Sequence, residues 1–176
     1  MLHCEARRGA RRNGKGQYVP LSEQDPKQCS LPLIEEAERH LAQAFQRARV
    51  GRFQLEAAIQ SVHAGRARSG RTEWPAVARF YEQLTRISPA LGTRVGYAAA
   101  LGEVKGPEAG VTILESIDPE AVSQYQPCWA VRAHLLQHLG KTRDAADAYE
   151  RAIGLAEDPA VKEFLLQKRG ELIRPS

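Results

Sequence analysis

Cysteines, long hydrophobic runs and aromatic residues are all scarce in this sequence. Its 176 residues include only three cysteines, Cys4, Cys29 and Cys128, and aromatic residues make up 6% of the chain. An odd number of widely spaced cysteines argues against a disulfide framework and against a zinc knuckle, so we expect reduced, structural thiols. No run approaches the roughly 18 apolar residues of a membrane span, and the first residues lack a signal-peptide pattern. These absences favour a cytoplasmic protein that contacts no membrane.

The sequence also lacks the residue patterns of an enzyme. Residues 9–16 match a phosphate-binding loop at Gly9, Gly14 and Lys15, but Gly16 stands where that loop needs a hydroxyl to bind magnesium. No Ser/His/Asp or Cys/His set can be assembled from spacing alone. We therefore predict that the chain has no catalytic activity, no cofactor and no metal site.

Positive charge is concentrated toward the start of the chain. Residues 1–72 contain 13 Lys and Arg against 7 Asp and Glu, whereas the remaining residues contain 12 against 14. The densest cluster consists of four arginines, Arg7, Arg8, Arg11 and Arg12. Such a cluster can contact the phosphates of a nucleic acid, but no aromatic residues interleave with it as stacking platforms. Solvated surface charge is the favoured interpretation, and direct DNA contact is the alternative.

Small and aromatic residues recur with helical spacing in the last third of the chain. The positions are Trp129, Ala133, Leu136, Gly140, Ala145, Tyr149 and Ala152. Residues four and seven apart share one face of a helix, and Gly140 can end the first helix in a left-handed conformation. The pattern resembles one tetratricopeptide repeat, a helix-turn-helix unit of about 34 residues. An ordinary helical hairpin with the same spacing is the alternative interpretation.

The first helix of this unit also carries polar residues. In tetratricopeptide repeats, as the resemblance implies, the positions of Ala130, His134, Gln137 and His138 look into a concave groove. We expect Tyr97, on a central helix, to belong to the same groove. His134 and His138 have the spacing of two metal ligands, but no third ligand is nearby. Partner contact and plain solvent exposure are the two interpretations of this face.

Gly and Pro turns separate about four helical hairpins, and no segment between them is a convincing β-strand. The sequence predicts an all-α, TPR-like right-handed superhelix in one domain, 1–176. Its expected parts are a leading helix and extended loop over 1–29, a first helix pair over 30–71, middle helices over 72–125, the best-matching repeat unit over 126–159 and a capping helix over 160–176.

Three local expectations follow from the apolar periodicity and the helix breakers. Phe45 belongs to the buried stripe of the helix that begins after Ser30. Residues 65–71, which contain Gly, Arg and Ser, form a loop. Ile87 lies on the core side of the helix that follows this loop.

Several short sequence motifs follow one another along nearly the whole chain. They include Ala6-Arg7-Arg8, Leu21-Ser22-Glu23-Gln24-Asp25, Phe53-Gln54-Leu55-Glu56-Ala57-Ala58-Ile59, Thr72-Glu73-Trp74, Glu103-Val104-Lys105-Gly106-Pro107-Glu108-Ala109-Gly110 and Leu139-Gly140-Lys141-Thr142. Together they resemble the C-terminal, TPR-like extension of a group of bacterial extracytoplasmic-function sigma factors. The sequence departs from that family at Gly96-Tyr97, where the resemblance leads us to expect an asparagine-arginine pair.

The resemblance implies a non-catalytic domain that takes part in the control of transcription initiation. Nothing in the chain resembles the promoter-melting and promoter-recognition domains of a complete member, so we expect that it does not initiate transcription alone. The expected partners are proteins, namely the sigma-factor domains, the RNA polymerase core or a regulatory protein. A free-standing adaptor and a nucleic-acid-binding helical repeat that uses the four arginines are the alternatives.

Overall fold

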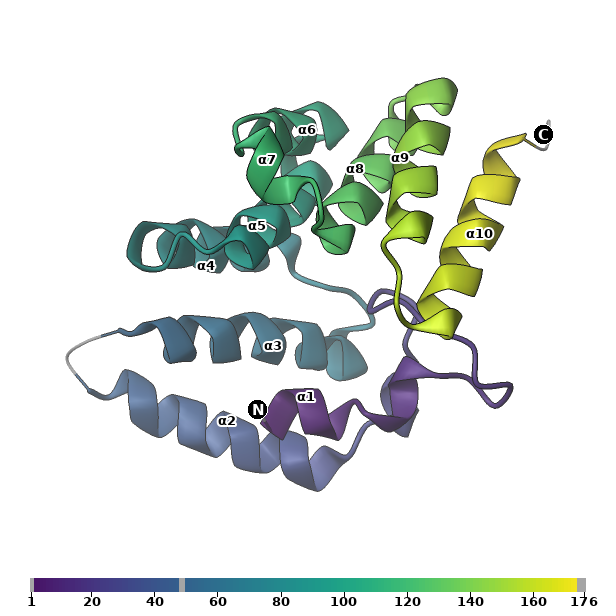
Figure 1. The fold of residues 1–176 in the computed structure, drawn as a ribbon. Helices are drawn as coiled ribbons and strands as arrows, with labels where there is room; N and C mark the ends of the chain where they lie inside the picture. Colours follow the sequence, from purple (N-terminus) through teal and green to yellow (C-terminus); the bar gives the residue numbers. More distant parts are fainter. Residues whose placement is uncertain (1, 48–49, 174–176) are drawn as a thin grey trace. The chain divides into compact units, whose positions relative to one another are not determined.

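The computed structural model describes residues 2–47 and 50–173, and every regular element within these ranges is a helix (Figure 1). The helices are α1 (Leu2–Ala6), η1 (Gly9–Arg11), η2 (Pro26–Gln28), α2 (Leu31–Phe45), α3 (Arg52–Ser69), α4 (Trp74–Ile87), α5 (Leu91–Lys105), α6 (Pro107–Glu115), α7 (Pro119–Val122), α8 (Gln126–His138), α9 (Thr142–Gly154) and α10 (Pro159–Ile173), where η marks a 3-10 helix. The β pairing found in these ranges is a single antiparallel bridge between Arg12 and Tyr18. The all-α prediction is confirmed, whereas a superhelix that spans the chain stays a prediction.

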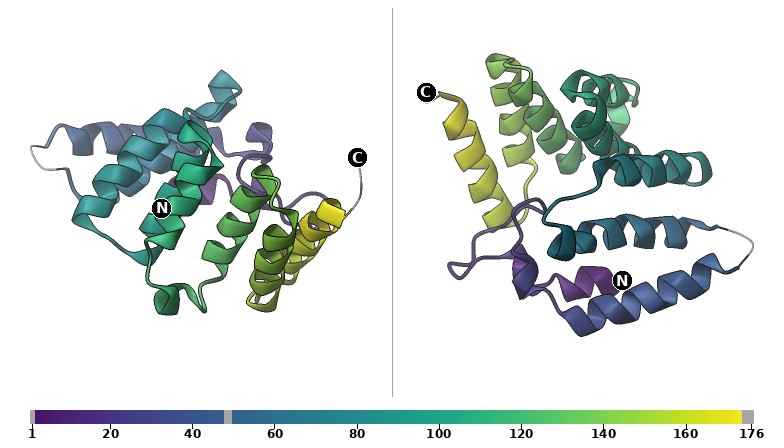
Figure 2. Two further views of the ribbon diagram at one scale, coloured as in Figure 1. Left: turned by 90° about the horizontal axis from the view of Figure 1, so that it is seen from above. Right: turned by 180° about the vertical axis from the view of Figure 1, so that it is seen from behind.

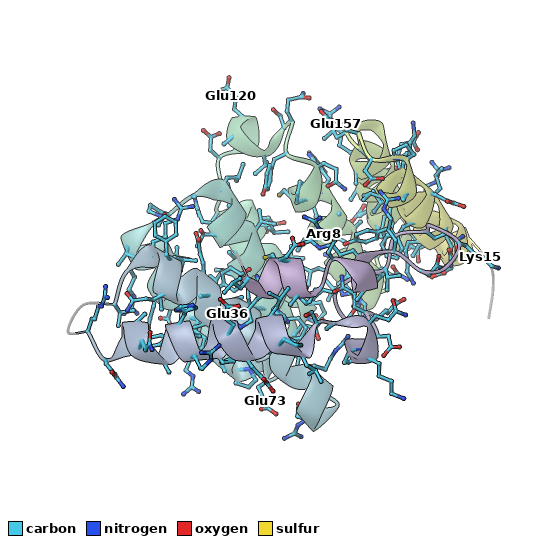
Figure 3. All side chains as sticks on the ribbon, turned by 90° about the horizontal axis from the view of Figure 1, so that it is seen from below. Arg8, Lys15, Glu36, Glu73, Glu120 and Glu157 are labelled. Carbon is cyan, nitrogen blue, oxygen red and sulfur yellow. The ribbon has the colours of Figure 1, made fainter. Side chains whose placement is uncertain are left out.

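The chain forms two compact units, residues 1–88 and 89–176. The first holds α1 to α4 with both 3-10 helices, and the second holds α5 to α10. Charged side chains such as Lys15 and Glu120 project from the surface of their units (Figure 3). None of the helices that the structure describes is both long enough and apolar enough to pass through a membrane.

Helix α3 is central to the first unit. It packs against α2 and α4 and also contacts α1. Among the described residues, the largest fully buried side chains are Leu55 and Ile59 from α3 and Val77 and Leu84 from α4. A smaller buried cluster joins α1, α2 and α3 through one small or branched residue from each helix, namely Ala6, Ile34 and Ala64.

The predicted loop over residues 65–71 is wrong, because α3 continues to Ser69. Gly65 lies inside this helix and has no neighbouring atom within 4 Å of the place where a Cβ would be. A single glycine weakens a helix by only about 1 kcal/mol, and the burial of apolar residues along α3 outweighs that cost. The helix ends at Ser69, and its C-cap is Gly70, whose φ of 73° is the left-handed conformation that favours glycine.

Phe45 and Ile87 are not core residues, although their spacing predicts burial. Phe45 is 40% exposed and Ile87 is 52% exposed. Each is the last residue of its helix. The buried residues of α2, Ile34 and Ala37, both lie in its N-terminal half, whereas Phe45 is at its C-terminal end. Helix α1 packs on α2. The apolar periodicity identifies the buried face of each helix. It does not show how far along the helix the neighbouring helix that covers this face extends.

The second unit is built from consecutive helix pairs. Helices α5 and α6 pack together, as do α8 and α9, and α10 packs on α9 (Figure 2). At the end of α8, the amide of Lys141 donates to the carbonyl of Leu136 and the amide of Gly140 donates to the carbonyl of Gln137. With Gly140 at a φ of 69°, this pattern is a Schellman C-cap, which turns the chain directly into α9. The predicted hairpin and its glycine cap are confirmed, and the last three residues of the predicted capping segment, 174–176, lie outside the described residues.

Two glycines create a notch that receives Leu135 of α8. A Cβ on Gly102 of α5 would lie 2.5 Å from Cδ2 of Leu135. A Cβ on Gly110 of α6 would lie 2.7 Å from the carbonyl oxygen of Ala98 and 2.8 Å from Cδ1 of Leu135. Leu135 is 4% exposed and belongs to the main core of the unit. The absence of these two side chains therefore sets how closely α5, α6 and α8 approach one another.

We predict that Gly110→Ala lowers the free energy of unfolding of the second unit by about 1–3 kcal/mol, because the new methyl group overpacks the notch against a backbone carbonyl. The matched control is Gly154→Ala at the end of α9, where a Cβ would meet no atom within 4 Å. This control should be neutral or slightly stabilising. Urea unfolding followed by Trp129 fluorescence measures both changes, and equal stabilities of the two variants would contradict the notch.

Candidate partner-binding surfaces

Helix α8 places His134 and His138 side by side on an exposed face of the second unit. Their ring centroids are 4.3 Å apart, and the ring Nδ1 of His138 donates to the carbonyl oxygen of His134 at 2.8 Å. Both residues are exposed, whereas Leu135 and Leu136 on the same helix are buried. The structure therefore brings the two predicted histidines together, one turn apart.

A carboxylate from α5 joins this histidine pair. Nε2 of His134 lies 3.8 Å from Oε1 of Glu103. Partial burial lowers the pKa of His134, and repulsion from His138 lowers it further, while Glu103 acts in the opposite direction. The lowered pKa favours the neutral imidazole, which has one donor and one acceptor nitrogen, and Nε2 is the nitrogen that faces Glu103. The α5 residue that pairs with His134 is Glu103, which the sequence did not indicate.

The other predicted groove residues are more engaged in packing. Ala130 is half-buried against the main core of the unit. The amide oxygen of Gln137 accepts a hydrogen bond from the Tyr149 hydroxyl at 2.8 Å, which links α8 to α9. Tyr97 is half-buried on α5, a helix that contacts α8. Among the described residues, no group of three or more His, Cys, Asp and Glu side chains could hold a metal ion.

The four N-terminal arginines differ widely in their surroundings. Arg7 is 8% exposed, and its guanidinium donates to the amide oxygens of Gln24 and Gln60. Arg8 is exposed and forms an ion pair with Glu5 at 2.8 Å.

The last two arginines of the cluster are exposed and bind backbone carbonyls. Arg11 donates to the carbonyl of Cys4 at 3.4 Å, and Arg12 donates to that of Gly16 at 3.0 Å. All four arginines thus use donors within the chain, and the buried Arg7 has little surface left for a phosphate.

His63 of α3 also makes an internal contact, with Trp74 at the start of α4. Its ring meets the ring of Trp74 edge-on, with centroids 5.5 Å apart and an interplanar angle of 77°. Burial, together with the positive charges of Arg7 and Arg66, lowers the pKa of His63 to about 4. Arg66 itself donates to the carbonyls of Ser22 and Gln24, so it holds the extended N-terminal loop against α3.

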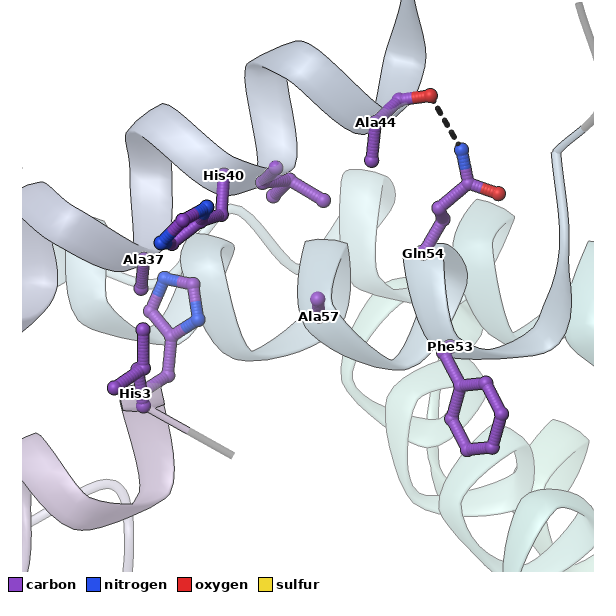
Figure 4. Close-up of a pocket in the computed structure, with 9 residues that line it drawn as sticks. His3, Ala37, His40, Ala44, Phe53, Gln54 and Ala57 are labelled. Carbon is purple, nitrogen blue, oxygen red and sulfur yellow. Dashed lines mark hydrogen bonds between the residues drawn. The ribbon is translucent and has the colours of Figure 1, made fainter. Parts of the chain in front are cut away.

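The structure also contains an apolar pocket of about 280 Å³ in the first unit (Figure 4). Helices α1, α2 and α3 form it, through Leu2, His3, Ala37, His40, Leu41, Ala44, Phe53, Gln54 and Ala57. Gln54 donates to the carbonyl of Ala44 at 2.7 Å, and this bond joins the α2 and α3 sides of the pocket (Figure 4). Phe53 is 78% exposed, the largest exposed fraction among the large apolar side chains that the structure describes. A phenylalanine beside a helix start, outside the apolar stripe of α3, is the sequence signal that could have indicated this surface.

Comparison with known proteins links the chain to uncharacterised relatives. Residues 1–45 match a family of unknown function, DUF6596. The chain is 32% identical over 165 residues to an uncharacterized protein of Rhizobium meliloti (strain 1021). This match covers 94% of the present chain and 38% of the rhizobial protein, so the chain spans about two fifths of the length of that relative. No solved structure matches the chain.

We predict that the first unit loses stability as the pH falls from about 6.5 to about 4. The pKa of His63 in the folded state is about 4, below the ordinary value of 6.5, so the unfolded chain binds the proton first. The stabilising effect of neutral His63 is complete above the unfolded pKa and is lost as the pH falls through the folded pKa. The loss should reach about 2–3 kcal/mol.

This pH dependence can be measured by urea unfolding at about pH 7 and about pH 4.5, followed by Trp74 fluorescence in a Trp129→Phe background. His63→Gln should flatten the pH dependence, because glutamine does not titrate. His40→Gln replaces an exposed histidine and should leave it unchanged. An equal effect of both substitutions would assign the acid sensitivity to other groups.

Proposed function

We propose that this chain is a non-catalytic regulatory domain of an extracytoplasmic-function RNA polymerase sigma factor, and that it acts by binding a protein partner. The observation that carries the proposal is the exposed pair His134 and His138 on a helical hairpin of tetratricopeptide type. Hairpin repeats commonly bind other polypeptides through the face that their first helices present. With Nε2 of His134 facing Glu103, the other ring nitrogen of His134 is the directional hydrogen-bonding group for such a partner.

The positions of these motifs in the fold support the resemblance to the sigma-factor extension. Leu55 and Ile59, from the motif over residues 53–59, are among the largest fully buried side chains. Gly110 closes the notch around Leu135, and Gly140 caps α8. These motifs therefore contain residues on which the helix packing depends, as expected if a shared fold explains the resemblance.

The length of the rhizobial relative is compatible with this proposal. About three fifths of that protein lies outside the match, which is enough for promoter-melting and promoter-recognition domains. The proposed domain would regulate such domains or the polymerase core and would not bind a promoter itself. The internal contacts of Arg7 and Arg8 favour protein over nucleic acid as the partner.

The test is a binding experiment with the immobilised chain. Purified sigma promoter-binding domains and core RNA polymerase, from the bacterium that encodes the chain, are offered separately. We expect at least one of them to be retained, and His134→Ala with His138→Ala should weaken its binding about tenfold or more, as substitutions at an interface centre do.

Lys162→Ala with Glu163→Ala on α10 is the matched control, because both residues are exposed in the same unit. Circular dichroism and thermal unfolding verify that each variant remains folded. Retention of neither protein would refute the proposed partners. Equal binding by the two double variants would place the contact on another surface.

A further inference from the structure

The apolar pocket of the first unit has the size of a small-molecule site. Its volume is about 280 Å³. An engineered apolar cavity of about 150 Å³ binds benzene, and natural ligand pockets begin at about 300 Å³. The pocket therefore has room for a molecule with two fused rings or the equivalent.

Most polar groups around this pocket already have partners. The side-chain nitrogen of Gln54 donates to the carbonyl of Ala44, and its oxygen accepts from the amide of Gly51. His40 is exposed, and its Nε2 lies 3.7 Å from Oε1 of Glu36. Among the described residues that line the pocket, none is Asp, Glu, Lys or Arg. One further polar side chain remains to contact a bound molecule.

This side chain is His3 of α1, which is 3% exposed. Its Nε2 lies 2.9 Å from Oε1 of Glu38, and because a carboxylate only accepts, Nε2 carries the hydrogen. The hydrogen bond that the described residues make to this ring uses Nε2 and leaves Nδ1 without a partner. One ring nitrogen points toward α2 and the other toward the side of the pocket where Ala57 lies (Figure 4). An unsatisfied, nearly buried polar atom is costly, so Nδ1 favours a ligand that bonds to it.

A hydroxyl group matches Nδ1 in either protonation state of the imidazole. Nδ1 accepts a hydrogen bond in the neutral ring and donates one in the doubly protonated ring, and a hydroxyl can do both. The carboxylate of Glu38 on the far side of the ring repels an anion, and apolar walls disfavour any formal charge. The chemistry of the pocket therefore selects an uncharged molecule with a hydroxyl group.

Phe53 provides an aromatic surface for the remainder of such a molecule. It lines the pocket from the first turn of α3, and it lies at the opposite end of the lining residues from His3 (Figure 4). Its side chain is 78% exposed, so a bound apolar group would remove part of this surface from water. Aromatic pairs gain more than the burial of area alone. An aromatic ligand consequently fits this end of the pocket best.

We propose that the pocket formed by α1, α2 and α3 binds a small, uncharged aromatic molecule that carries a hydroxyl group. The hydroxyl forms a hydrogen bond with Nδ1 of His3. The rings occupy the space lined by Ala37, Leu41 and Ala57 and contact Phe53. The site belongs to the first unit, so its test is independent of partner binding by the histidine face of α8.

Three probes with the same fused-ring system test this proposal on the full chain. They are 2-naphthol, naphthalene, which lacks the hydroxyl, and 2-naphthoate, which carries a negative charge. In equilibrium dialysis, 2-naphthol should bind saturably at one site per chain. It should bind about fivefold more tightly than naphthalene, the effect of one net hydrogen bond, and 2-naphthoate should bind most weakly. A lack of saturable 2-naphthol binding, or equal affinities for the three probes, would overturn the proposal.

Two substitutions of histidine by phenylalanine test the hydrogen bond. His3→Phe keeps a ring of similar size but removes Nδ1, so it should abolish the preference for 2-naphthol over naphthalene. His40→Phe replaces the exposed histidine that lines the same pocket and should preserve the preference. Loss of the preference in both variants, or in neither, would refute the assigned role of His3.

A second pair of variants tests the location of the ligand. Ala57→Leu adds an isopropyl group within the pocket and should weaken the binding of both uncharged probes about tenfold or more, because the new group occupies their space. Ala42→Leu makes the same addition at an exposed position of α2 outside the lining and should leave binding unchanged. Equal affinities of these two variants for 2-naphthol would contradict the site. Circular dichroism verifies the fold of each variant, and the comparison of the three probes on the unsubstituted chain decides the proposal where a variant does not fold.

Discussion

Leu135 holds the second unit together because two glycines leave space for it. Its side chain occupies the room that Cβ atoms on Gly102 and Gly110 would fill, and the carbonyl of Ala98 borders the same space. Three helices consequently meet at one apolar residue, and the register between α5, α6 and α8 is set there. The position of His134 next to Glu103 depends on this register, because the two residues come from α8 and α5. The exposed polar face is thus a consequence of the packing beneath it.

The α8–α9 hairpin of the second unit could be predicted from the sequence, because its contacts are local. The spacing from Trp129 to Ala152 identifies α8 and α9, and Ala133, Ala145 and Ala152 are fully buried as their pattern implies. The first unit was harder to predict. Gly65 lies inside α3, and the packing of α3 against α2 and α4 stabilises this helix. Phe45 is exposed at the end of α2, and no local sequence signal shows that no other helix covers it there.

The candidate partner-binding surfaces also combine local features, which the sequence predicts, with features that depend on tertiary packing. The pairing of His134 with His138 is a property of one helix, so the sequence predicts it. Glu103, 31 positions before His134, becomes its neighbour only through tertiary packing. The four arginines read alike in the sequence, yet Arg7 is buried and Arg8 is exposed. Their difference depends on Gln24 and Gln60, which lie 17 and 53 positions from Arg7.

Two arginines of the first unit bind groups that are far from them in the sequence, so folding must close long loops to form these contacts. Arg66 joins α3 to carbonyls 44 and 42 positions earlier, and Arg7 joins Gln60 across 53 positions. The entropy lost in closing a loop grows with its length, by about 0.6 kcal/mol for each doubling. Contacts between residues so far apart raise the contact order of the first unit, the property that relates topology to folding rate.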